Sequence, residues 1–189
     1  MSRFDLPPDL PRPVDDGACA HLPGFRIPSA KLSATDSGSV DLSELFGRIV
    51  LFCYPRTGPP NEPIPKDWDA IPGARGCTPQ ACSFRDSYQS LLDAGANRIF
   101  GLSTQDTAYQ QEAAARLHLP YSLLSDNTLV FSRALRLPTF DFAGMTLIKR
   151  LTLIIDQGVI TKVFYPVFPP DESANETLHW LKEHPPRAA

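Results

Sequence analysis

Cys77 and Cys82 lie close together at the beginning of a predicted helix, and they are the residues of this chain best suited to redox chemistry. A cysteine at a helix N-terminus lies near unpaired backbone N–H groups and the positive end of the helix dipole, which both stabilise a thiolate. Arg75 and Arg85 add positive charge nearby. The sequence therefore predicts a reactive nucleophile at Cys77.

The spacing of the two cysteines sets a condition on any bond between them. In an intact helix, residues at this separation have Cα atoms about 8.6 Å apart, whereas a disulfide is hard to form above roughly 7 Å. The sulfur atoms can therefore meet only if the first turns of the helix unwind. A structural role for Cys82, as a half-buried helix cysteine, is the alternative.

The helix itself is predicted from an apolar stripe with helical spacing, and the stripe comprises Ala81, Phe84, Tyr88, Leu91 and Leu92. The Thr78 hydroxyl could cap the beginning of this helix, and Pro79 is well tolerated in a first turn. Gly95 is a typical residue just after a helix end. We expect one helix within residues 76–92, with Cys77 at or just before its N-terminus.

Three short motifs in this segment, Gly76-Cys77-Thr78, Ala81-Cys82 and Phe84-Arg85-Asp86, resemble the Q-type (bacterioferritin-comigratory) branch of the peroxiredoxin superfamily. The resemblance runs from about Leu22 to Leu181 and includes Phe52-Cys53-Tyr54-Pro55, Leu119-Pro120 and Leu123-Leu124-Ser125-Asp126. It implies that Cys77 is the peroxidatic cysteine and Cys82 the resolving cysteine. It also implies that Arg150 is the active-site arginine, although its position alone is equally consistent with a solvated strand end.

The loop before Cys77 departs from this family. Ala70 and Ala74 stand where the family has its active-site proline and threonine, and Pro55 lies much further back. An insertion at about residues 58–71, rich in proline and containing Trp68, separates Pro55 from the helix. Pro55, Thr57 and Arg85 are less certain candidates for positioning the substrate, with Thr57 able to supply the missing hydroxyl.

The rest of the chain alternates strands and helices, which predicts an α/β sandwich with a central mixed β-sheet flanked by helices. The resemblance implies that this sandwich has the thioredoxin-like fold. Predicted strands are 25–32, 39–42, 49–54, 98–103, 121–124, 148–155 and 159–165, and further helices are 107–117, 129–135 and 173–183. Residues 1–21 are expected to form an irregular N-terminal arm and 22–189 one peroxiredoxin domain. Cys53 is expected in the core, whereas nothing in the sequence gives Cys19 a partner.

Composition excludes several other classes of protein. The 189 residues carry 18 basic and 21 acidic side chains without a basic block, which argues against nucleic-acid binding. No apolar run could span a bilayer, and the N-terminus lacks a signal peptide, so a cytoplasmic location away from the membrane is expected. Four cysteines are too few for a disulfide scaffold, and the scattered histidines predict no metal site.

These features together predict a thiol-dependent peroxidase that reduces hydrogen peroxide and organic hydroperoxides. The cycle would form an intramolecular Cys77–Cys82 disulfide, recycled by thioredoxin or a similar dithiol, with no cofactor. A general thiol–disulfide oxidoreductase is one alternative, although Cys-x-x-Cys is the usual spacing there. A non-catalytic thioredoxin-like redox sensor or binding module is a second alternative. The sequence does not distinguish a monomer from a homodimer.

Overall fold

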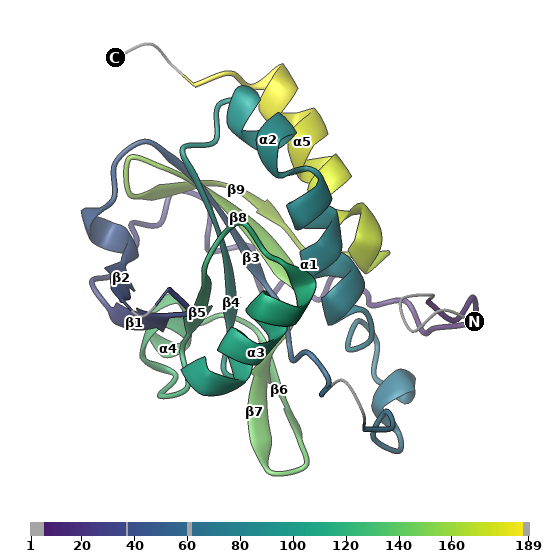
Figure 1. The fold of residues 1–189 in the computed structure, drawn as a ribbon. Coiled ribbons are helices and arrows are strands. Elements are labelled where there is room, and N and C mark those ends of the chain that lie inside the picture. Colours follow the sequence, from purple (N-terminus) through teal and green to yellow (C-terminus); the bar gives the residue numbers. More distant parts are fainter. Residues whose placement is uncertain (1–5, 37, 60–61, 187–189) are drawn as a thin grey trace.

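A computed structural model describes residues 6–36, 38–59 and 62–186. Within these ranges, seven strands form one sheet in the order β2-β1-β5-β4-β3-β8-β9 (Figure 1). The strands of this sheet are β1 (Lys31–Ala34), β2 (Ser39–Asp41), β3 (Arg48–Cys53), β4 (Arg98–Ser103), β5 (Leu123–Ser125), β8 (Leu151–Asp156) and β9 (Val159–Phe164). β4 runs parallel to β3 and β5, whereas β8 runs antiparallel to β3. The predicted mixed α/β sheet is therefore confirmed.

Helices cover both faces of this sheet. They are α1 (Cys77–Asp86), α2 (Tyr88–Asp93), α3 (Thr107–Leu117), α4 (Val130–Leu135) and α5 (Ser173–Glu183). α1, α2 and α5 lie together along one side of the sheet, and α4 lies near β1 (Figure 1). Among the described residues, each helix is too short or too polar to span a bilayer.

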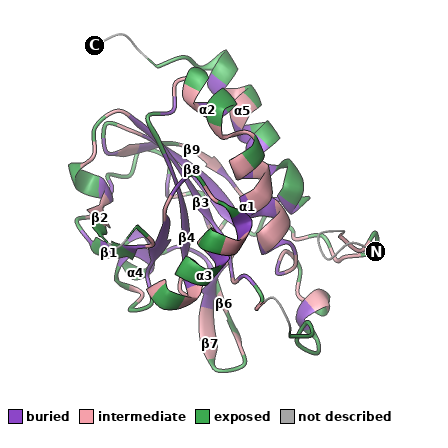
Figure 2. Cartoon of the chain, in the orientation of Figure 1, coloured by how far each residue is buried: buried purple, intermediate pink, exposed green. Residues whose placement is uncertain are grey.

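The core is organised by β3, in which every residue is buried (Figure 2). Successive side chains of a strand point to opposite faces of the sheet. Val50 and Phe52 therefore join the apolar cluster under α1, α2 and α5. Ile49, Leu51 and Cys53 join the second cluster, which contains residues of α4. The predicted central strand and the core position of Cys53 are both confirmed.

The single helix predicted within residues 76–92 is two helices. The backbone of Ser87 leaves helical geometry, with φ −95° and ψ 3°, and separates α1 from α2. The expected cap at Thr78 is also wrong, because Gly76 occupies the N-cap position without a side-chain hydrogen bond. The predicted place of Cys77 at the helix N-terminus is confirmed, since α1 begins there. Gly95 follows the end of α2 with a φ of 101°.

A hairpin that the sequence did not predict lies between α4 and β8. It pairs β6 (Thr139–Phe142) with β7 (Met145–Ile148) and extends beyond the lower end of the main sheet in Figure 1. Ala143 and Gly144 form its turn with φ values of 48° and 76°, which is the backbone that two-residue hairpin turns require. The predicted strand 148–155 is therefore divided, since Ile148 ends β7 and Leu151 begins β8.

The first predicted strand, 25–32, is placed too early. β1 begins only at Lys31, and Arg26 makes an isolated bridge to Val159. Pro28 lies between these two pairings, and proline has no N–H to donate to a strand ladder. β5 and α4 begin one or two residues later than predicted, which is the usual uncertainty of element ends.

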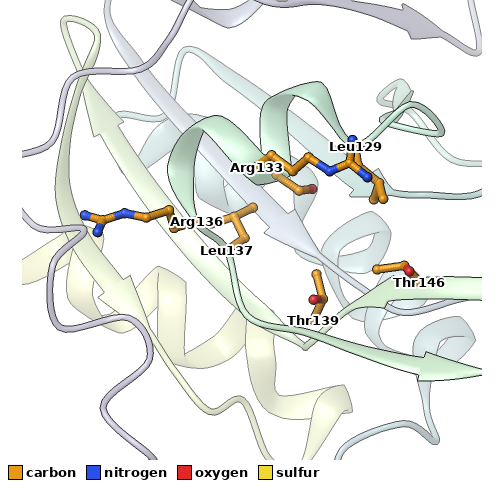
Figure 3. Close-up of a pocket in the computed structure, with 7 residues that line it drawn as sticks. Leu129, Arg133, Arg136, Leu137, Thr139 and Thr146 are labelled. Atoms are coloured by element: carbon orange, nitrogen blue, oxygen red, sulfur yellow. The ribbon is translucent and has the colours of Figure 1, made fainter.

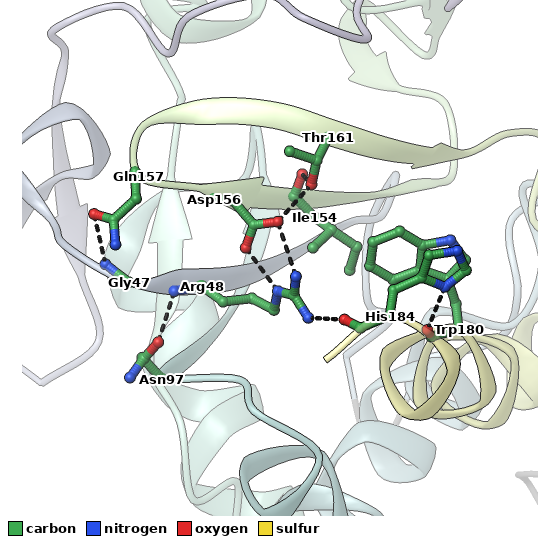
Figure 4. Close-up of polar contacts among 9 residues, drawn as sticks. All are labelled: Gly47, Arg48, Asn97, Ile154, Asp156, Gln157, Thr161, Trp180 and His184. Carbon is green, nitrogen blue, oxygen red and sulfur yellow. Dashed lines mark hydrogen bonds and ion pairs between the residues drawn. The ribbon is translucent and has the colours of Figure 1, made fainter. Parts of the chain in front are cut away.

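A buried arginine fastens the end of α5 to the sheet (Figure 4). Arg48 donates to both carboxylate oxygens of Asp156, at 2.6 and 3.0 Å, and to the carbonyl of His184. Its guanidinium also lies 5.5 Å from the centre of the Trp180 ring. Such bidentate pairing is strong and directional, so it fixes α5 along the face of the sheet that α1 shares.

Candidate active site

Cys77 is the first residue of α1, and the residue is 4% exposed. Its Sγ donates to the carbonyl of Ala74 at 3.6 Å. Gly76 brings the chain into the helix with a φ of 102°, and a Cβ added there would lie 2.3 Å from Pro170 Cγ. Only glycine fits this position, so the approach to Cys77 is fixed by both backbone conformation and space.

Arg150 contacts the sulfur atom directly. Its Nη2 lies 3.2 Å from Cys77 Sγ, and the arginine is 3% exposed. The same guanidinium donates to the carbonyls of Gly73, Ala74 and Arg75 at 3.3, 3.1 and 3.2 Å. The sulfur atom is therefore in hydrogen-bond contact with a buried, fixed positive charge. Arg150 directly precedes β8, and β8 pairs with β3 in the centre of the sheet. This pairing places Arg150 beside the beginning of α1.

Three polar residues that the sequence did not single out support this arginine. Gln80, which is fully buried, accepts a hydrogen bond from Arg150 Nη1 through Oε1 and donates to Ser173 Oγ at 3.2 Å. Ser173 Oγ lies 3.3 Å from Thr152 Oγ1. The sequence did offer one signal for Gln80, because a glutamine lies there on the buried side of the helix, about one turn after Cys77.

Tyr54 is a further neighbour of the site. Its hydroxyl accepts a hydrogen bond from Gln110 Nε2 at 3.2 Å. Burial raises the pKa of this phenol, and the nearby charge of Cys77 raises it further. The hydroxyl therefore stays protonated and can donate a hydrogen bond.

Thr57 makes no hydrogen bond to the sulfur atom in the part of the chain that the structure describes. It is buried, and its Oγ1 donates to Gln105 Oε1 at 3.3 Å, while its backbone N donates to the same oxygen at 2.9 Å. The carbonyl of Pro55 accepts from Ser103 Oγ at 2.9 Å. The hydrogen bonds of Thr57 go to Gln105, in the loop before α3, and to Tyr109 of α3, so its hydroxyl is held by Gln105.

Arg85 has other partners than Cys77 among the described residues. It pairs with Asp86 at 2.8 Å and donates to the carbonyl of Leu117 at 2.9 Å. It lies close to Cys82 instead, where its charge partly opposes the effect of burial, which raises the pKa of that thiol. Of the two roles considered for Arg85, this geometry fits a structural ion pair.

Cys82 lies on α1 and is half-buried. All four cysteines are free, and α1 is intact between Cys77 and Cys82. In the described ranges, no group of three or more His, Cys, Asp or Glu side chains could hold a metal ion.

Cys77 opens onto a cavity of about 300 Å³. Its wall includes residues of the insertion (Gly58, Pro59, Glu62, Pro63, Ile64, Pro65 and Trp68), together with Thr78, Pro79 and Leu117. Trp68 also packs edge-on against Phe142 of the β6–β7 hairpin, with ring centres 5.0 Å apart. The insertion therefore lies over the cysteine and is braced by the hairpin.

A second cavity, of about 330 Å³, lies at the end of α4 (Figure 3). Its lining includes Arg133, Arg136, Thr139 and Thr146, and it contains no cysteine. The side chain of Arg136 points away from that of Arg133 (Figure 3). This cavity has no thiol in its lining, so the candidate redox site is the cavity at Cys77.

Comparison with known proteins identifies the family. Residues 22–178 match the family model described as Redoxin. The chain is 34% identical over 161 residues to the chloroplastic peroxiredoxin Q of Oryza sativa subsp. japonica, a match that covers 84% of this chain and 66% of the rice protein. This chain therefore spans slightly less than two thirds of that relative's length.

Solved structures agree in fold. Peroxidoxin BcpB from Mycobacterium tuberculosis superposes with a TM-score of 0.70 at 25% identity, over 89% of this chain and 100% of that one. Reduced Prx3 from Vibrio vulnificus superposes with a TM-score of 0.67 at 25% identity, over 86% and 97%. This chain belongs to the Redoxin family, in its peroxiredoxin Q branch.

Proposed function

We propose that this protein is a thiol-dependent peroxidase with Cys77 as its peroxidatic cysteine. The observation that carries the proposal is the contact of 3.2 Å between Arg150 Nη2 and Cys77 Sγ beside a cavity. A thiolate is the nucleophile needed for peroxide reduction, and a fixed cation can stabilise the charge that develops on the departing oxygen. The Prx3 relative from Vibrio vulnificus was solved in complex with hydrogen peroxide, which supports the same substrate class here.

In the first step, the Cys77 thiolate attacks one oxygen of the hydroperoxide. An S–O bond forms as the O–O bond breaks, and the other oxygen leaves as hydroxide or alkoxide and takes a proton from solvent. The products are water or an alcohol and a sulfenic acid on Cys77. Arg150 acts twice, by contacting the attacking sulfur and by stabilising the leaving oxygen.

In the second step, Cys82 is the resolving cysteine. The beginning of α1 unwinds, the Cys82 sulfur attacks the sulfenic sulfur, and an S–S bond forms as water leaves. The support for this step is that Cys82 is a free thiol on the same helix. An external dithiol, thioredoxin or a similar protein, then reduces the disulfide by exchange.

The remaining parts of the proposal concern organisation and location. We place an irregular arm at residues 1–21 and the peroxidase domain at 22–189, with the active-site insertion at about 58–71. Pro55, Thr57 and Arg85 would act only through the fold around the site. A cytoplasmic location stays a prediction, since the rice relative is chloroplastic by name, and the choice between monomer and homodimer stays open.

The test is catalytic peroxide turnover with thioredoxin, thioredoxin reductase and NADPH. The parent protein should consume hydroperoxide with matching NADPH oxidation, and Cys77→Ser should abolish both. Cys53→Ala is the matched control, because Cys53 is a buried thiol on the opposite face of the sheet and should keep activity. Disulfide exchange without peroxide consumption would instead indicate a general oxidoreductase, and thioredoxin binding without turnover would indicate a sensor or binding module.

A further inference from the structure

The N-terminal arm is fixed to the domain close to the site. Asp16 accepts hydrogen bonds from Lys149 Nζ at 2.8 Å and from the Tyr165 hydroxyl at 2.9 Å. Cys19 and Leu22 are buried in the core. Lys149 directly precedes Arg150, so the arm is held beside the residue that contacts the sulfur.

From that attachment, the arm runs across the loop before Cys77. Pro13 Cγ lies 3.4 Å from where a Cβ on Gly73 would stand, and the Arg12 guanidinium lies 5.4 Å from the centre of the Phe168 ring. Leu6 Cδ2 lies 3.1 Å from where a Cβ on Gly76 would stand. The arm therefore contacts both ends of the loop whose carbonyls hold Arg150.

Leu6 also lines the cavity onto which Cys77 opens. The insertion contributes other apolar side chains to the same cavity, including Ile64 and Trp68. The described arm and the insertion thus supply wall residues that come from neither the sheet nor its helices. The cavity of about 300 Å³ is far larger than the share of roughly 30 Å³ that a molecule the size of water occupies in its liquid.

We propose that Leu6 is a specificity-determining residue, through which the N-terminal arm favours hydroperoxides with an apolar body over hydrogen peroxide. This inference rests on the proposed peroxidase function of Cys77. Hydrogen peroxide fills only a small part of the cavity and gains little from an apolar wall. A hydroperoxide with a bulky hydrocarbon group buries that group against Leu6 and the insertion, which removes apolar surface from water.

The experiment compares two substrates in one variant. Leu6→Ala should lower kcat/KM for cumene hydroperoxide at least fivefold and leave kcat/KM for hydrogen peroxide within twofold of the parent value. Leu6→Met conserves side-chain volume and should restore most of the rate with cumene hydroperoxide. Leu10→Ala is the matched control, because Leu10 is also half-buried in the arm but does not line this cavity. It should leave both substrates within twofold.

The outcomes separate the inference from the function on which it rests. Equal losses with both substrates would show that Leu6 acts only by supporting the loop, and would overturn its role in specificity. An unchanged or improved rate with cumene hydroperoxide would overturn it as well. If turnover is lost in Cys77→Ser while Leu6→Ala behaves as the parent, the peroxidase function stands and this inference alone is wrong. Turnover that persists in Cys77→Ser would instead contradict the function itself.

Discussion

Replacement of Arg150 by lysine tests the geometry of the site most directly, because it keeps the positive charge and removes the planar fork. The guanidinium contacts Cys77 Sγ, Gln80 Oε1 and three loop carbonyls at the same time. An ammonium group has only three donors and cannot serve these acceptors in the same arrangement. We expect Arg150→Lys to fold with reduced stability and to react slowly with peroxide.

The expected size follows from the one contact to sulfur. A hydrogen bond to a charged group contributes about 1.5–3 kcal/mol, and each 1.36 kcal/mol changes a rate tenfold. Loss of the contact of 3.2 Å between Nη2 and Sγ should therefore lower the rate constant for oxidation of Cys77 by about 10- to 150-fold. An acceptor left buried and unpaired should also lower the free energy of unfolding by about 1–3 kcal/mol.

The rate is best measured in a Cys82→Ser background, in single turnover, by trapping the sulfenic acid on Cys77 at timed intervals after adding peroxide. Arg75→Lys is the matched control. Arg75 lines the same cavity and pairs with Asp69 at 3.1 Å, but its side chain makes no hydrogen bond to Cys77 among the described residues. It should stay within threefold of the parent.

Circular dichroism decides whether each variant is folded. A folded Arg150→Lys protein that forms sulfenic acid within threefold of the parent rate would refute the argument. If the variant does not fold, Gln80→Met provides the second test, because it leaves Arg150 in place and removes one acceptor that orients it. It should slow sulfenic acid formation, and an unchanged rate in that variant would count against the argument in the same way.

Three further predictions follow from the site and the core. One equivalent of peroxide should give a Cys77–Cys82 disulfide by peptide mapping, and Cys82→Ser should accumulate sulfenic acid on Cys77; a bond from Cys77 to another cysteine would reassign the resolving role. Because Trp68 lines the cavity, its fluorescence emission in a Trp180→Phe protein should shift on oxidation and return with dithiothreitol. The emission should stay constant when Cys82→Ser is added. Constant emission while the disulfide forms would mean that the insertion lies away from the part of α1 that unwinds. Burial raises the pKa of Cys19 from 9.0 to about 12, so above about pH 9 the folded protein keeps a proton that the unfolded chain loses. The free energy of unfolding should therefore fall with rising pH, by up to about 1.4 kcal/mol per pH unit. Urea titrations at about pH 8 and 10.5 should show a smaller fall in Cys19→Ala, and an equal fall would contradict this reading.

Features that depend on neighbours in sequence were predictable. The apolar run of β3 identified a central strand, and the cysteine motif with its helical stripe identified the beginning of α1 at Cys77. The ranges of α3 and α5 were also predicted correctly. The break at Ser87 and the β6–β7 hairpin were not, because each depends on a few backbone angles that short stretches of sequence specify weakly.

The sequence alone determined the candidate nucleophile, since the type of residue 77 and its place at a helix N-terminus depend only on neighbours in the chain. What surrounds Cys77 was decided by the tertiary structure. Arg150 reaches it across 73 positions of the chain only because β8 pairs with β3. Thr57, much nearer in sequence, is held by Gln105 instead. Hydrogen bonds between distant segments depend on sheet register and packing, and no local pattern records them, so the arm, the insertion and the arginine came together only in the folded chain.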